Sequence, residues 1–159
     1  MKQKPHAIHE FKNNYDVDVF EDANKASIGV TVRNDKGEVL AAVFEKISMP
    51  LFVVMVEILV AKRAVQFTIE IDITHSIFEG NSAIVYKVIT QDTSPLSVIG
   101  HLIKGTKSIT GLVVNNSLSH TRRWSNIVAF ALVRRTRPFF SFVSLDVVCS
   151  SRCFKFPYF

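Results

Sequence analysis

Glu57 is the residue whose position in the sequence points most directly to chemistry. It interrupts an apolar run over residues 51–61. If this run is helical, one stripe of the helix carries Glu57 together with Val53, Val54, Val60, Ala61 and Ala64. Such a stripe is expected to face the core, where a carboxylate is costly unless it is paired, protonated or bound to a metal. Glu57 is therefore the first candidate for a catalytic or metal-binding residue.

Two further acids that could converge on Glu57 lie in the segment 15–20, where apolar and acidic residues alternate. This alternation is typical of a half-buried strand. Asp16 and Asp18 are two residues apart, so their side chains share one face of that strand. The residues alone leave a second interpretation open, in which the segment is a solvated edge with ordinary surface acids.

A basic segment near residue 120 suits contact with phosphate groups. It contains His120, Arg122, Arg123 and Asn126. Side chains of these types make the sequence-independent contacts of nucleic-acid binding. A solvated basic loop is the alternative. Trp124 could stack on a base or anchor the packing of a helix.

The cysteines and histidines argue against a zinc site and against a secreted protein. His6 and His9 lie at one end of the sequence, and Cys149 and Cys153 lie at the other, with irregular spacing. The N-terminus is polar without a following apolar region, and the 51–60 run is too short to span a bilayer. We expect a reducing intracellular setting, in the nucleus or the cytoplasm.

The elements that must position these residues follow the order of an α/β domain with a mixed sheet. Strands are expected over 15–20, 27–33, 38–44, 73–79 and 111–119, and helices over 50–70, 83–91, 96–108 and about 125–137. A hairpin turn is expected at 34–37, with Gly37 in a left-handed conformation. Asn81 and Ser82 are both good N-caps for the second helix.

Composition and charge indicate one globular domain with an anionic partner. The chain has 159 residues, 48% of them hydrophobic, and a net charge of +5. We expect a loose leader over 1–13, the domain over 14–137 and an aromatic-rich tail over 138–159. The tail could bind a partner, add a strand or be translated non-coding sequence. The last is favoured, because exposed aromatics without a partner promote aggregation.

Four stretches resemble a plant ribonuclease H-like domain of the retroelement-type group, which is related to reverse-transcriptase ribonuclease H. They are residues 28–42, 56–64, 78–83 and 119–129. Each is a weak motif alone, but their order and spacing are specific, and the resemblance covers about 15–137. It implies a five-stranded mixed sheet, with three antiparallel strands followed by parallel strands, flanked by helices. It also implies endonuclease cleavage of the RNA strand of an RNA–DNA hybrid.

The resemblance further implies four acidic positions that hold two divalent metal ions, Mg²⁺ or Mn²⁺, for phosphodiester hydrolysis. The second position falls on Glu57. The first falls on Asp18, with Asp16 as the runner-up, because the Gly-Ala that follows the family's acid is missing here. The third falls on Asn81, which is neutral, and the fourth falls on Phe130, whose ring cannot bind a metal.

Two of the four metal positions are thus degenerate, which leaves Asp18 and Glu57 as the expected ligands. Because metal affinity depends on the number of carboxylates, hydrolysis is expected to be weakened or lost. The basic segment matches the family's loop before the last helix, so we expect it to bind RNA–DNA hybrid or RNA. A non-catalytic interaction or structural domain that retains only the fold is the alternative, and a decaying gene product is the third hypothesis.

Overall fold

The structure is a computed structural model, and it describes residues 10–91, 98–113, 115–122 and 127. Its elements are β1 (Phe11–Phe20), the 3₁₀ turn η1 (Glu21–Ala23), β2 (Lys25–Arg33), β3 (Val39–Ser48), α1 (Val53–Glu70), β4 (His75–Gly80), α2 (Ala83–Thr90), α3 (Val98–Thr110) and β5 (Asn115–His120). This order agrees with the expected α/β pattern through β5. The last expected helix, Phe130 and the segment 138–159 lie outside the described residues, although Ile127 is helical.

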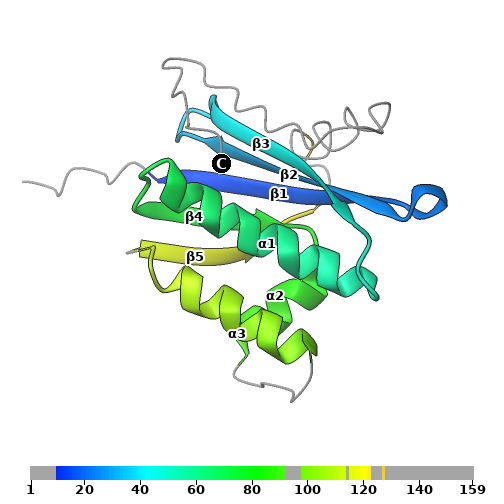
Figure 1. Cartoon of the computed structure of the whole chain (residues 1–159). Coiled ribbons are helices and arrows are strands. Elements are labelled where there is room, and N and C mark those ends of the chain that lie inside the picture. The colour runs from blue at the N-terminus through cyan, green and yellow to red at the C-terminus, as the bar shows by residue number, and fades with distance from the viewer. Residues whose placement is uncertain (1–9, 92–97, 114, 123–126, 128–159) are drawn as a thin grey trace, which may run out of the picture.

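The strands form a five-stranded mixed sheet in the order β3-β2-β1-β4-β5 (Figure 1). Strands β1, β2 and β3 pair antiparallel, whereas β4 runs parallel to β1, and β5 runs parallel to β4. The expected sheet is therefore confirmed. Strand β1 lies between β2 and β4 over residues 12–15, whereas residues 16–20 pair with β2 alone.

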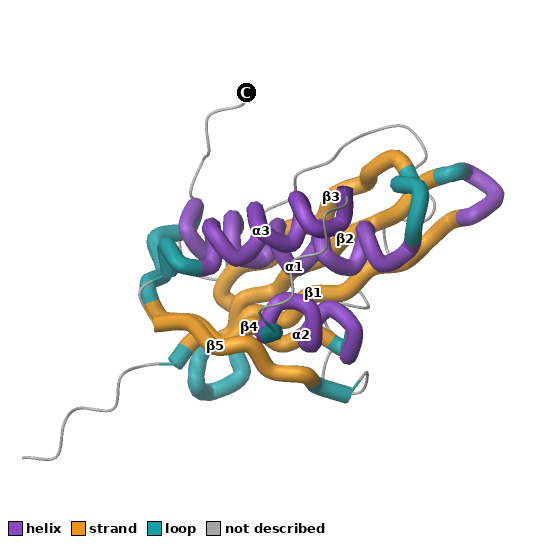
Figure 2. The backbone as a smooth tube through the Cα atoms, turned by 90° about the horizontal axis from the view of Figure 1, so that it is seen from below, coloured by secondary structure: helices purple, strands orange, loops and turns teal. Residues whose placement is uncertain are grey.

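The three helices cover one face of this sheet, with α1 packed directly on the strands and α3 beside it (Figure 2). The core between α1 and the sheet contains fully buried residues from both layers, including Val30, Val32, Val60, Phe67 and Phe78. Each such side chain contributes about 1.5–3 kcal/mol through burial. None of the helices in the described part of the chain is long and apolar enough to cross a membrane.

The turn at residues 34–37 has the predicted conformation. Gly37 has a φ of 81°, which is the left-handed region that favours glycine, and its N–H donates to the carbonyl of Asn34. The side-chain oxygen of Asn34 accepts the N–H groups of Lys36 and Glu38 at 3.0 and 2.9 Å. Local hydrogen bonding therefore determines this turn.

Two element boundaries differ from the expectation near the candidate residues. Strand β1 begins at Phe11, so residues 11–13 belong to the sheet and not to the leader, because they pair with β4. Helix α1 begins at Val53 rather than Pro50, and Phe52 before it has extended backbone angles without a side-chain cap. Val53 is therefore 51% exposed, and the core-facing part of the stripe is formed by Val60, Ala61 and Ala64.

Smaller shifts occur in the C-terminal half. Strand β4 begins at His75, α3 covers Val98–Thr110, and β5 begins at Asn115. These ends depend on which residues find a partner strand or helix, and that information is not local in the sequence.

Candidate functional site

Glu57 meets the end of strand β4 through a side-chain hydrogen bond. The hydroxyl of Ser82 donates to Glu57 Oε2 at 2.7 Å. Ser82 is also the N-cap of α2, since its oxygen accepts the N–H of Val85 at 3.3 Å. One hydroxyl thus joins α1 to the start of α2, two residues beyond β4. In the described part of the chain, Glu57 forms no salt bridge with Lys or Arg.

Tyr15 completes the immediate surroundings of Glu57. It pairs with Gly80 at the end of the parallel β1–β4 ladder. A Cβ at Gly80 would overlap the Tyr15 ring carbons and lie 2.6 Å from its Oη, so only glycine allows this packing. Burial, and then the charge of Glu57, raise the pKa of Tyr15 well above its ordinary value of 10.0. A neutral phenol therefore lies near the carboxylate.

The sequence analysis did not single out Tyr15 or the contact between Ser82 and Glu57. Gly80 was the available signal, because a glycine at a strand end can mark the close approach of another group. Ser82 was recognised only as a possible cap. Of the two residues expected as possible caps, the structure makes Ser82, and not Asn81, the cap of α2. The reason is that α2 begins at Ala83, and the cap is the residue directly before it.

Asp16 and Asp18 both lie on β1 beyond its pairing with β4. Asp16 directly follows Tyr15, whose pair with Gly80 is the last of the parallel ladder, and Asp18 lies two residues further, about 6.6 Å along the strand. Asp16 is buried, and its Oδ1 accepts the N–H of Val17 at 2.8 Å. Tyr15 packs in the core below α1, so alternation places both aspartates on the opposite face of the sheet.

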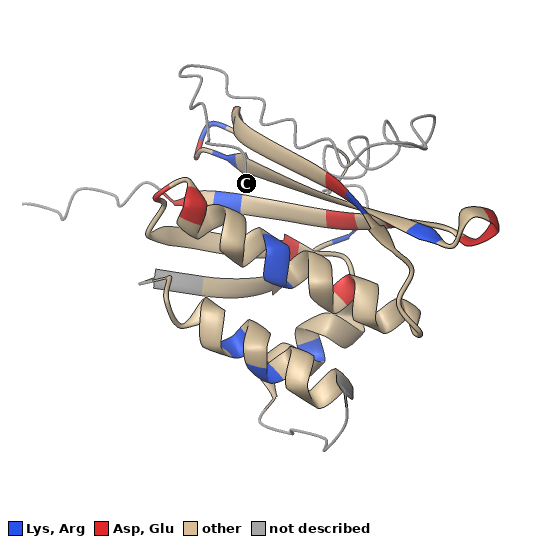
Figure 3. Cartoon of the chain, viewed as in Figure 1, with Lys and Arg blue, Asp and Glu red and all other residues tan. Residues whose placement is uncertain are grey.

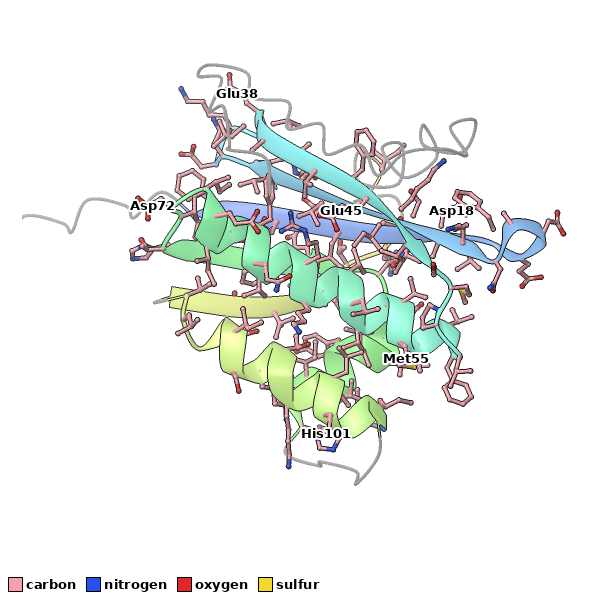
Figure 4. The ribbon with its side chains drawn as sticks, in the orientation of Figure 1. Asp18, Glu38, Glu45, Met55, Asp72 and His101 are labelled. Carbon is pink, nitrogen blue, oxygen red and sulfur yellow. The ribbon has the colours of Figure 1, made fainter. Side chains whose placement is uncertain are left out.

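Asp18 is half-buried, opposite Ser27 of β2. Its Oδ2 is shielded from solvent and has no hydrogen-bond partner within the described part of the chain. Figure 4 shows Asp18 toward the connection between β1 and β2, whereas Met55 marks the first turn of α1 on the helical side. The structure therefore brings Glu57 to Tyr15 and Ser82, and it does not record a contact between Glu57 and Asp18.

Asn81 and the start of the basic segment lie side by side. His120 Nε2 is 3.3 Å from the carbonyl oxygen of Asn81, and the N–H of Thr121 donates to the carbonyl of Gly80 at 2.9 Å. Arg122 is exposed to solvent. His120 and Arg122 are therefore adjacent to the tip of β4. Arg123, Trp124 and Asn126 lie outside the described residues.

A polar network holds the strands in register on the face away from α1. Asn14 of β1 donates to Glu79 of β4 at 2.9 Å and accepts from Arg33 of β2 at 2.9 Å. Glu79 also lies 3.2 Å from the ammonium of Lys12 and 3.7 Å from the guanidinium of Arg33. These bonds tie β2, β1 and β4 together one residue before Tyr15 and Gly80. They therefore help to position the site.

The described residues do not fit a two-magnesium centre. Magnesium prefers several carboxylate oxygens and gives up its own water reluctantly. Here Glu57 already accepts a hydrogen bond from the Ser82 hydroxyl, and Asn81 is neutral. Nowhere in residues 10–91, 98–113, 115–122 and 127 do three His, Cys, Asp or Glu side chains come close enough to hold a metal ion.

The model of the reverse transcriptase-like family matches residues 14–136. The chain therefore belongs to this family. No curated protein matches the sequence significantly. The family match includes β1 from Asn14 onward, where Asp16 and Asp18 lie, and the whole site around Glu57.

Solved structures show that the fold is that of ribonuclease H. RNase H1 from Halobacterium salinarum superposes with a TM-score of 0.72 at 16% identity, over 81% of this chain and 98% of that one. The N-terminal RNase H domain of Rv2228c from Mycobacterium tuberculosis has a TM-score of 0.70 at 12% identity, over 82% and 95%. LC11-RNase H1, solved with an RNA/DNA hybrid, has 0.69 at 17%, over 79% and 94%.

Proposed function

We propose that the chain is a nucleic-acid-binding domain of the ribonuclease H type, with RNA–DNA hybrid or RNA as its ligand and with hydrolysis weakened or lost. Its family and fold support the first part, as does the RNA/DNA hybrid bound to LC11-RNase H1. His120 and Arg122 lie beside the tip of β4, and we propose that they contact phosphates together with Arg123 and Asn126.

The observation that carries the second part is the environment of Glu57. Its carboxylate accepts a hydrogen bond from the Ser82 hydroxyl next to the neutral Asn81, where the family resemblance implies a further acid. We keep Asp18 and Glu57 as the remaining metal ligands of the ancestral site. The strand register makes Asp16 the alternative, since it is the acid nearer to the tip of β4. Magnesium or manganese dependence, plant origin and retroelement origin stay predictions.

The test is a cleavage and binding assay with a labelled RNA–DNA hybrid in Mg²⁺ and in Mn²⁺. Three proteins are compared: the unaltered chain, Asn81→Asp, and the double variant with Asn81→Asp and Phe130→Asp. We expect the unaltered chain to bind without cleaving, and cleavage to return in the double variant, because two carboxylates are restored. Binding should weaken as salt rises.

A matched control separates restored chemistry from a contaminating nuclease. Glu57→Gln in the double variant removes one charge without changing the size of the side chain, and any restored cleavage should disappear. Cleavage by the unaltered chain would show that the site is not impaired. Absence of binding to hybrid and to RNA would instead favour an interaction domain that retains only the fold.

A further inference from the structure

Charge is distributed very unevenly along this chain. Residues 1–79 contain nine Lys and Arg and twelve Asp and Glu, whereas residues 80–159 contain ten and two. The small positive net charge therefore hides an acidic first half and a strongly basic second half. Such asymmetry creates a field that orients an anionic ligand on the surface.

Three basic side chains of the first half, Lys12, Arg33 and Arg63, pair with acids in the fold. Glu79 neutralises Lys12 and Arg33. Arg63 of α1 pairs with Glu45 at 2.5 Å and with Glu70 at 3.0 Å. Ion pairs of this kind leave little positive charge for a ligand.

The lysines on α2 and α3 are in a different situation. Helices α2 and α3 contain Lys87, Lys104 and Lys107 but no acid (Figure 3). Over the described stretches of the chain, none of the three forms a salt bridge. Lys107 donates instead to the backbone carbonyl of Gln91 at 2.6 Å. Among the residues that the structure describes, their charges are therefore not compensated by neighbouring carboxylates.

These lysines form one surface, which we call the cationic surface (Lys62, Lys87, Lys104 and Lys107). The bond to Gln91 places Lys107 at the end of α2, one turn after Lys87. Lys104 is exposed and lies one turn before Lys107 on α3. Lys62 of α1 reaches the same helix, because a Cβ at Gly105 would lie 3.8 Å from its Nζ. The surface thus extends over three helices.

The cationic surface begins close to the site around Glu57. Lys87 lies five residues after Ser82, so its Cα is about 7.5 Å further along the axis of α2. Acidic residues gather elsewhere: Glu21 and Asp22 are in the β1–β2 connection, and Asp35 and Glu38 are at the β2–β3 turn. A polyanion is therefore attracted to α2 and α3 and repelled from the tips of the antiparallel strands.

We propose that the cationic surface binds the phosphate backbone of one strand of a nucleic acid whose neighbouring nucleotides lie at the Glu57–Ser82 contact. The inference rests on the proposed function and adds to it residues outside the basic segment that begins at His120. Lysines bind phosphates as point charges, without base specificity. The surface therefore supplies affinity and orientation, and the bound strand continues from it past Ser82.

The experiment compares two double variants of equal charge. One carries Lys87→Gln and Lys104→Gln, and the matched control carries Lys25→Gln and Lys36→Gln, both exposed and on the antiparallel strands or their turn. Dissociation constants for a labelled RNA–DNA hybrid and a single-stranded RNA are measured from about 50 to about 200 mM salt. Lys107 is left intact because it bonds to Gln91.

We expect the first variant to bind more weakly at low salt and to depend less on salt. Losing two phosphate contacts makes the slope of log K against log salt shallower by about 1.8 on the duplex. Across the tested range this makes the loss of affinity about tenfold smaller than in the unaltered chain. The control variant should keep the slope of the unaltered chain.

Each other outcome overturns the inference in a recognisable way. Equal effects of both double variants would mean that net charge alone matters. If the unaltered chain binds and the first variant has the same salt slope, the cationic surface does not contact the nucleic acid, but the proposed function still stands. No binding by the unaltered chain would overturn the proposed function itself. Urea unfolding checks that each variant is folded. If the first variant is unfolded, the single change Lys104→Glu replaces it. This change should raise the dissociation constant further at low salt.

Discussion

Replacing Ser82 with alanine tests the contact that organises the site, because a single hydroxyl makes two interactions. It donates to Glu57 at 2.7 Å and accepts the Val85 N–H at 3.3 Å. Loss of a serine N-cap costs about 0.5–2 kcal/mol, and the long distance favours the lower end. A hydrogen bond to a charged group contributes about 1.5–3 kcal/mol, and partial exposure again favours the lower end. We therefore expect Ser82→Ala to lower the free energy of unfolding by about 2 kcal/mol.

Urea unfolding followed by circular dichroism measures this change. With a slope of about 2 kcal/mol/M, the midpoint should fall by about 1 M. Ser82→Thr keeps the hydroxyl and is the matched control, with a loss of no more than about 0.5 kcal/mol expected. In a Glu57→Ala background, Ser82→Ala should cost only the cap, about 0.5 kcal/mol, since the second partner is already absent.

Two results would refute this reasoning. Equal costs of Ser82→Ala with and without Glu57 would show that the two side chains are not coupled. A loss below about 0.5 kcal/mol in the unaltered chain would show that neither bond contributes in solution. In either case the hydroxyl would not hold Glu57 at the tip of β4.

Three further predictions concern neighbouring positions. Folding raises the pKa of Tyr15, so above pH 10.0 the unfolded tyrosine loses its proton before the folded one does, and the free energy of unfolding falls by up to about 1.4 kcal/mol per pH unit. Tyr15→Phe should therefore lose stability less steeply with rising pH in urea titrations. Identical slopes in the two proteins would contradict the shift. Gly80→Ala should cost about 1–3 kcal/mol by overpacking the Tyr15 ring, and the added change Tyr15→Val should recover part of it in the same assay. Thr31→Val should stabilise the fold by about 1 kcal/mol and raise the thermal midpoint, because the buried hydroxyl of Thr31 finds no hydrogen-bond partner among the described residues. A lower midpoint would refute this.

Features determined by neighbouring residues were predictable from the sequence. The turn at 34–37 depends on the side chain of Asn34 and the freedom of Gly37, and both act within five residues. The end of α1 at Glu70 and the start of α2 at Ala83 followed from apolar periodicity and capping. The family resemblance supplied the directions of the strands, three antiparallel and then parallel.

Strand register was not predictable to the residue. Residues 11–13 look like a polar leader but pair with β4, and that pairing decides that Asp16 rather than Asp18 directly follows the end of the ladder. A shift of two residues keeps every side chain on its face, so the alternation of Asp16 and Asp18 could not distinguish them. The first acidic position therefore stays a prediction with two candidates.

The sequence by itself determined the chemical types at the site: an acid within an apolar helical run, a neutral asparagine where a further acid is implied, and basic residues with few acids after residue 80. Only the tertiary structure decided their neighbours. Tyr15, Glu57 and Ser82 come from three distant segments, and they meet because the parallel β1–β4 ladder ends at Gly80 where α1 crosses the sheet. Contacts between distant segments depend on packing geometry, which local sequence patterns do not encode.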